Sequence, residues 1–314
     1  MNTRDWFWQL DHLLARVAGM LGVRISRDRP VDCIDSGMHP VAAYYAANGR
    51  PVAFDAPLER LRGLGANAFA CHVESNHPYV LALLDYRSGL YSEYSGSVLE
   101  TFYRCCQPRT ASEHLGVDCL PEVSVLKELP PEMAVLPWQK ETPDEWWRIV
   151  RRSVVKDQKR IAEGGVVSEA DWHFFGPMSP AAGRREWRRL VDLYHAMKTQ
   201  GYRRSPRLEG DVTGQLLLDD RDSSCWAFCV LGGGQHRSAV AGAIGHRSIP
   251  VRLAANRTPI VVRSHVDYWP QVQSGLFTIS SALEVFDRIV AGRQPFPWNG
   301  RRNVAGPENA DAVV

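Results

Sequence analysis

Three consecutive glycines at positions 232–234 separate two segments with opposite preferences for secondary structure. The apolar run 225–231 is rich in strand formers and predicts a short buried strand. The small residues at 238–244 predict a helix, which Gly245 can end in a left-handed conformation. A strand that passes through glycines into a helix leaves backbone N–H groups free at the positive end of the helix dipole. The sequence therefore predicts an α/β fold with an anion-binding site at this junction.

Two basic side chains, His236 and Arg237, follow the glycines and can add donors for an anion. The pattern is not a Walker A loop, because it lacks the Lys-Ser/Thr ending. It is not a dinucleotide-binding fingerprint either, because Arg237 stands where the third glycine would fall. The alternative interpretation is a glycine-rich turn between a core strand and a core helix, with His236 and Arg237 on the surface.

The Gly-Gly-x-His-Arg motif, entered from a strand and followed by an alanine-rich helix and by residues 248–251, resembles the sulfiredoxin/ParB-like superfamily. The upstream segment 190–202 is similar to the first helix of that fold, and residues 214–218 are similar to the strand after it. The resemblance covers roughly residues 170–255. By position, it implies that nucleotide phosphates are held by Gly232, Gly233, Gly234, Gln235, His236 and Arg237.

Activities in this superfamily include ATP-dependent sulfinic-acid repair, phosphorylation of free serine and CTP-dependent DNA clamping. Sulfiredoxin has its reactive cysteine immediately before the histidine, where this chain has Gln235. A carboxamide cannot form the thiol-based intermediate, so sulfinic-acid repair is not expected. The resemblance instead implies a kinase-like phosphotransferase that uses ATP or ADP with Mg²⁺ and acts on a small hydroxylated metabolite or a sugar.

Phosphoryl transfer also needs a group that positions and deprotonates the acceptor, usually a carboxylate. Glu209 and Asp211 are candidates, because they lie between the expected helix and strand on a loop that should pass near the glycines. His173 is a third candidate, since the chain that enters the first helix borders the phosphate site in related folds. We interpret the acidic stretch 219–222 as a solvated turn.

Two other functions stay open at this point. A nucleotide-gated regulatory protein of the ParB type would sense a nucleotide at the loop and bind DNA or a partner through a basic patch. A non-catalytic accessory protein of glycan biosynthesis would bind a sugar phosphate. Through residues 102–108, 113–116, 175–179, 269–272 and 275–277, the whole chain resembles uncharacterised bacterial proteins, some from surface-polysaccharide gene neighbourhoods. No second helix-turn-helix pattern follows the loop, so a small-molecule or sugar substrate is favoured over nucleic acid. The basic patch that a ParB-type protein would use for DNA comprises Arg184, Arg185, Arg188, Arg189, Lys198, Arg203, Arg204 and Arg207.

Composition excludes several classes of protein. The formal net charge of +2 over 314 residues gives no global field for nucleic acid or membrane. No apolar run reaches the roughly 18 residues of a spanning helix, and residues 6–21 predict an amphipathic helix rather than a secretory signal. Seven cysteines without a Cys-x-x-Cys pair suggest neither a disulfide framework nor a zinc ribbon. We therefore predict a cytoplasmic protein without membrane contact, whose oligomeric state the sequence does not determine.

Prolines at 130, 131, 137 and 143 break regular structure and predict a linker at 129–144. This linker would join an N-terminal mixed α/β domain, residues 1–128, to the ParB/sulfiredoxin-like domain with its C-terminal helix, residues 145–300. The tail 301–314 lacks periodicity and is expected to be flexible. A capping box that joins Ser281 to Glu284 predicts the start of the last helix. His39, His72 and His77 have no metal-ligand spacing and are interpreted as structural.

Overall fold

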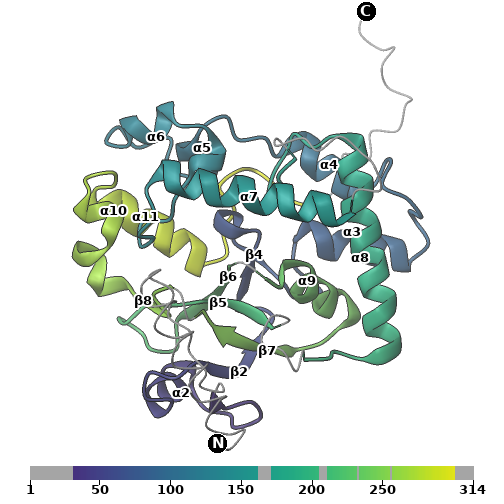
Figure 1. Cartoon of the computed structure of the whole chain (residues 1–314), viewed down its shortest axis with the longest axis horizontal. Helices are drawn as coiled ribbons and strands as arrows, with labels where there is room; N and C mark the ends of the chain where they lie inside the picture. The colour runs from purple at the N-terminus through teal and green to yellow at the C-terminus, as the bar shows by residue number, and fades with distance from the viewer. Residues whose placement is uncertain (1–30, 162–170, 205–210, 232, 255–256, 301–314) are drawn as a thin grey trace, which may run out of the picture.

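The computed structural model describes residues 31–161, 171–204, 211–231, 233–254 and 257–300, which form a mixed α/β fold (Figure 1). Its eight-stranded mixed sheet is curled into a half-barrel, in the order β1-β2-β7-β5-β6-β3-β4, with β8 paired to β5. The strands are β1 (Val31–Asp32), β2 (Val52–Pro57), β3 (Leu61–Gly63), β4 (Phe69–Ala70), β5 (Val212–Leu218), β6 (Trp226–Val230), β7 (Ser248–Leu253) and β8 (Ile260–Val262).

Helices surround this sheet. They are α2 (Pro40–Ala46), α3 (Pro78–Arg87), α4 (Val98–Cys105), α5 (Ala111–Leu115), α6 (Ser124–Glu128), α7 (Pro143–Ile161), α8 (Pro180–Gln200), α9 (Gln235–Ile244), α10 (Pro270–Gln273) and α11 (Ile279–Val290). Short 3-10 helices are η1 (Gly65–Asn67), η2 (Pro131–Met133) and η4 (Arg263–Tyr268). In the part of the chain that the structure describes, no helix combines the length and the apolar character that crossing a bilayer requires.

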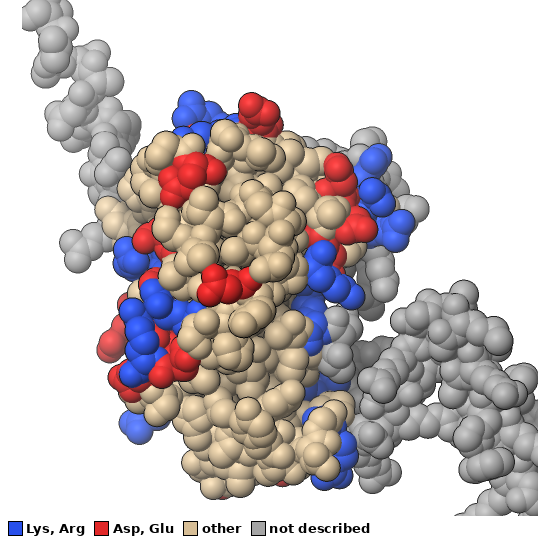
Figure 2. Space-filling view, turned by 90° about the vertical axis from the view of Figure 1, so that its left-hand side faces the viewer, with Lys and Arg blue, Asp and Glu red and all other residues tan. Residues whose placement is uncertain are grey.

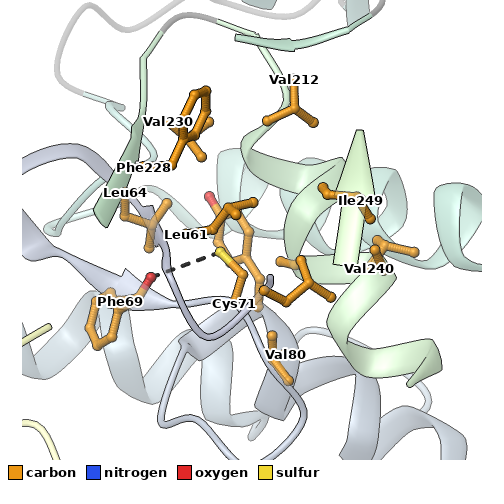
Figure 3. Packing of buried hydrophobic residues seen from close by; sticks show 14 of the residues in the cluster. Leu61, Leu64, Phe69, Cys71, Val80, Val212, Phe228, Val230, Val240 and Ile249 are labelled. Carbon is orange, nitrogen blue, oxygen red and sulfur yellow. Dashed lines mark hydrogen bonds between the residues drawn. The ribbon is translucent and has the colours of Figure 1, made fainter. Parts of the chain in front are cut away.

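Strands from both sides of the expected linker share one sheet, in which β7, β5 and β6 lie between β2 and β3. β7 pairs antiparallel with β2, where Val251 lies opposite Phe54, and parallel with β5. β6 pairs antiparallel with β5 and parallel with β3, where Phe228 lies opposite Leu61. Figure 3 shows Leu61 and Phe69 gathered with Phe228 and Val240 in one apolar cluster. The proline-rich segment 129–144 therefore does not separate two sheets or two cores.

The strand expected at 225–231 is confirmed as β6, and all five of its residues are buried. Trp226, Phe228 and Val230 belong to the cluster that includes residues of α3, α8 and α9. Ala227 and Cys229 belong to the cluster on the other face, which includes residues of α11. Both faces are covered, which explains why this strand is continuously apolar rather than alternating.

The ends of three helices, α8, α9 and α11, can be compared with the capping residues in the sequence. α9 ends at Gly245 with φ 101°, as the small-residue run predicts. α8 starts at Ser179, whose hydroxyl accepts from the N–H of Ala182, with Pro180 in the first turn. The capping box of α11 was predicted three residues too late, because Thr278 and Ser281 exchange the reciprocal bonds instead of Ser281 and Glu284.

The side of the molecule on the left of Figure 1, where α6, α10 and α11 lie, is poor in charge. Figure 2 shows that uncharged residues cover most of this face, while Lys, Arg, Asp and Glu gather mainly along its edges. A surface that binds nucleic acid needs a concentration of positive side chains. This face does not provide one.

Candidate functional site

The glycine loop leads into α9 as the sequence predicts, and Gly234 is the N-cap. Its φ of 107° favours glycine, and a Cβ at this position would lie 2.8 Å from Val212. Gly233 is exposed, while Gly232 lies outside the described residues. Within the described ranges no side chain caps α9, so the N–H groups of its first turn keep their capacity to bind an anion.

Arg237 lies on the first turn of α9, and its guanidinium carbon is 5.9 Å from the centre of the Tyr202 ring. Its Nη1 atom is buried and has no hydrogen-bond partner among the residues that the structure describes. Burial raises the pKa of Tyr202, whereas the positive charges of Arg237 and Arg204 act in the opposite direction. Tyr202 therefore stays protonated beside a cation that retains an unused donor.

Asp211, a predicted catalytic residue, lies beside this loop. Its carbonyl oxygen is 3.8 Å from the position that a Cβ on Gly233 would take. Its buried carboxylate Oδ2 lies 3.8 Å from Arg252 Nε and 3.9 Å from Arg204 Nη2. Arg204 also pairs with Asp32 Oδ2 at 2.7 Å, and Arg237, like Arg204 and Asp211, lies near Tyr202. Three arginines therefore face two carboxylates here, which leaves an excess of positive charge. We call Gly233, Gly234, Arg204, Arg237 and Arg252 the anion site.

His236 points away from solvent and is buried against α8. Its Nε2 lies 2.5 Å from Glu186 Oε2, and its ring stacks on Tyr79 with the centroids 5.1 Å apart. Burial would raise the pKa of Glu186, but the charge and hydrogen bond of His236, assisted by His173 and Arg189, lower it to about 2. The ionised carboxylate accepts the His236 N–H. His236 thus anchors α9 to α8, and the alternative interpretation of a surface histidine is wrong.

His173, the third candidate for the base, lies close to this pair. Its ring centroid is 5.7 Å from that of His236, and its carbonyl oxygen accepts hydrogen bonds from Tyr79 and Tyr103. Burial raises the pKa of both tyrosines, so they remain donors. The structure therefore places His173 with His236 and Glu186, whereas Asp211 lies beside Gly233 and, like Arg237, near Tyr202. Glu209 lies outside the described residues.

Gln235 does not face the loop, contrary to its expected role in holding phosphate. Its side chain is buried, where Oε1 accepts from the N–H of Leu64 at 2.8 Å. Its Nε2 donates to the carbonyl of Val230 at 2.7 Å. Both backbone groups need partners because they are buried. The carboxamide is therefore occupied in joining α9 to β6 and to the turn after β3.

The described donors near the loop do not fit the Mg²⁺ that the resemblance implies. Mg²⁺ requires oxygen ligands in near-octahedral geometry. Among the described residues, no three His, Cys, Asp or Glu side chains are placed to hold a metal ion. Asp211 offers a carboxylate, but two guanidinium groups already flank one of its oxygens, and their charges oppose a further cation.

Glu186 is the residue of this region that the sequence analysis missed. Its partner His236 lies 50 positions away, so no local motif joins them. The available signal was its place beside Trp187 on a helix whose apolar stripe faces the core.

A family-model scan, a search of curated proteins and a search of solved structures found no match to this chain.

Proposed function

We propose that the anion site binds the phosphates of ATP or ADP, and that the protein transfers a phosphoryl group to a small hydroxylated metabolite or a sugar. The observation that carries this proposal is the buried, unpartnered Nη1 of Arg237 beside the uncapped start of α9. A buried donor without a partner is costly, and an anionic ligand would satisfy it. The three arginines of the anion site outnumber the two carboxylates near them, Asp211 and Asp32, and this excess of positive charge supports the same ligand.

In the proposed reaction, the bond between the terminal phosphorus and its bridging oxygen breaks as the acceptor oxygen bonds to phosphorus. The acceptor proton passes to a base, for which Asp211 and His173 are the described candidates. Asp211 is the nearer to the loop, and Arg204 and Arg252 lie within 4 Å of its carboxylate. Arg237 and the first-turn N–H groups of α9 would stabilise the charge on the transferred group.

The finer fold assignment belongs to the same proposal. We infer that residues 170–255 form a sulfiredoxin/ParB-like unit, because α8, β5, β6, the glycine loop, α9 and β7 follow one another in the order that the resemblance implies. The cysteine required for sulfinic-acid repair is replaced by Gln235, which supports phosphoryl transfer or nucleotide sensing instead.

Replacing Arg237 with alanine tests the phosphate site. We expect the wild-type protein to bind ATP or ADP with micromolar affinity, and Arg237→Ala to weaken binding by roughly tenfold to a hundredfold, as the loss of a charge-assisted hydrogen bond predicts. Calorimetric titration with ATP, ADP and CTP, with and without Mg²⁺, measures this. Arg188→Ala is the matched control, because Arg188 is an exposed arginine on α8.

The outcomes of this titration, together with an assay of DNA retention, separate the candidate functions. No binding by the wild type contradicts the nucleotide proposal. An equal loss in both variants indicates unspecific attraction of anions by positive charge. Binding that depends on Arg237 justifies a screen for phosphorylated sugars by phosphorus NMR. Salt-sensitive retention of DNA that is lost in Arg188→Ala would instead favour the nucleotide-gated regulatory protein.

A further inference from the structure

A cavity of about 160 Å³ lies between α7, the short helix η1, the segment that follows η2, and the segment that precedes α8. Its volume is similar to that of a dry protein cavity that holds one benzene ring, about 150 Å³. Leu231, the last residue before the glycine loop, belongs to its wall, as does His173. The cavity therefore adjoins the start of the glycine loop but is built from other residues.

Aromatic side chains form much of the wall. Trp146 comes from α7, and Trp172 and Phe174 come from the segment before α8. The rings of Trp172 and Phe174 lie 4.7 Å apart at an angle of 31°. Flat faces of this kind pack well against another flat ring, which gains both buried area and favourable ring geometry. The walls thus favour an aromatic ligand over a branched aliphatic one.

Three residues that line the cavity carry buried nitrogen atoms without a hydrogen-bond partner among the described residues: Gln139 Nε2, Trp146 Nε1 and His114 Nδ1. Gln139 Oε1 accepts from the N–H of Leu136 at 2.6 Å, which fixes the orientation of its amide and leaves Nε2 as the unused donor. Gln139 is only 4% exposed. Buried N–H groups are normally paired, so the unpaired donors of Gln139 and Trp146 on residues that line one cavity point to a ligand with acceptor atoms.

The charge around the cavity favours an anionic acceptor. Arg257 lines the cavity, and its guanidinium carbon is 5.5 Å from the centre of the Trp146 ring. None of the residues that line the cavity is an aspartate or a glutamate. A bound carboxylate would therefore meet one cation and fixed N–H donors without a competing negative charge.

We propose that this cavity binds a single aromatic ring that carries a carboxylate. The ring would pack among Trp146, Trp172 and Phe174, and the carboxylate would accept hydrogen bonds from Arg257 and from the unused nitrogens of Gln139 and Trp146. This ligand contains no phosphate, so the site is additional to the nucleotide site proposed above. Its position next to Leu231 suits an aromatic acid that acts as a second substrate or an effector of the glycine loop.

Benzoate is the probe for this site, with benzyl alcohol as its uncharged counterpart and adenine as a neutral heteroaromatic ring. We expect calorimetry to detect benzoate binding to the full-length wild-type chain. Arg257→Gln should weaken it by roughly tenfold or more, and Trp146→Phe, which keeps a ring but removes the donor, by roughly threefold to tenfold. Arg148→Gln and Trp147→Phe on the same helix are matched controls, because neither residue lines the cavity. Benzyl alcohol should bind more weakly and be insensitive to Arg257→Gln.

Three results would overturn the proposal. They are the absence of benzoate binding to the wild type at millimolar concentration, equal affinities in the cavity variants and their controls, and preference for adenine without dependence on Arg257. Circular dichroism shows whether each variant is folded. Arg257 is half-buried, so its variant tests the site even if Trp146→Phe fails to fold. Benzoate binding is measured without nucleotide, which keeps its outcome distinguishable from that of the phosphate site.

Discussion

Replacing Gly242 with alanine will lower the free energy of unfolding by about 3 kcal/mol, although alanine is the better helix former. Gly242 lies within α9, where the exchange would favour an exposed helix by roughly 1 kcal/mol. Here, however, the new Cβ would lie 1.8 Å from the carbonyl oxygen of Cys71 and 2.9 Å from its carbonyl carbon. These are backbone atoms, so no side-chain rotation relieves the overlap. The helix or the segment after β4 must shift.

Urea unfolding of Gly242→Ala measures this loss, and Gly245→Ala is its control. Gly245 has φ 101° but no atom within 4 Å of the position of an added Cβ. The control therefore adds only backbone strain, about 1–2 kcal/mol. If Gly242→Ala is as stable as the wild type, α9 does not pack against the Cys71 segment as closely as described.

Acid will destabilise the protein between about pH 6.5 and pH 3, because His77 and His114 are buried in their neutral form. Burial lowers the pKa of each from 6.5 to about 3, and the charges of His236 and Arg288 respectively act in the same direction. Below pH 6.5 the unfolded chain binds a proton at each histidine that the folded chain does not bind until about pH 3. The stabilisation is thus fully present above 6.5 and falls by up to about 1.4 kcal/mol per pH unit for each histidine.

The variant His77→Asn isolates one of these contributions. His77 is the N-cap of α3, and its Nδ1 accepts from the N–H of Tyr79, a role that asparagine also fulfils. Urea unfolding across this pH range should show about half of the wild-type slope in the variant. His265→Asn, at an exposed position, should keep the full slope. An unchanged slope in His77→Asn would show that this histidine is protonated in the folded state.

The local elements around the glycines were predictable because the signals for them are local. A run of strand formers, three glycines and a small-residue helix lie within about twenty positions, and β6 and α9 follow them. The pairing of β2 with β7 was not predictable, since periodicity within a segment says nothing of its partner in the sheet. The prolines at 129–144 are also a purely local signal. They mark irregular backbone, yet Trp138 within this segment is buried against Trp269 and Phe286.

The candidate site was predictable in part. Asp211 and the glycine loop that leads to Arg237 come together because the chain before β5 and the loop after β6 meet at the same end of an antiparallel pair. Gln235, His236 and Arg237 follow one another on α9, so their side chains point about 100° apart around the helix. The motif could not show which of the three faces a ligand. The structure directs Gln235 and His236 inward, toward Val230 and Glu186.

The pairing of strands from distant parts of the chain has a consequence for how the protein forms. β2 pairs with β7, whose residues follow it by almost two hundred positions, and β3 pairs with β6 across a comparable separation. Folds dominated by such distant pairings form slowly, because a long loop must close before the pairing stabilises it. During synthesis on the ribosome, β2 cannot acquire its antiparallel neighbour until β7 has emerged. Until then its edge remains open to other chains, and that interval is when this protein is most prone to aggregate.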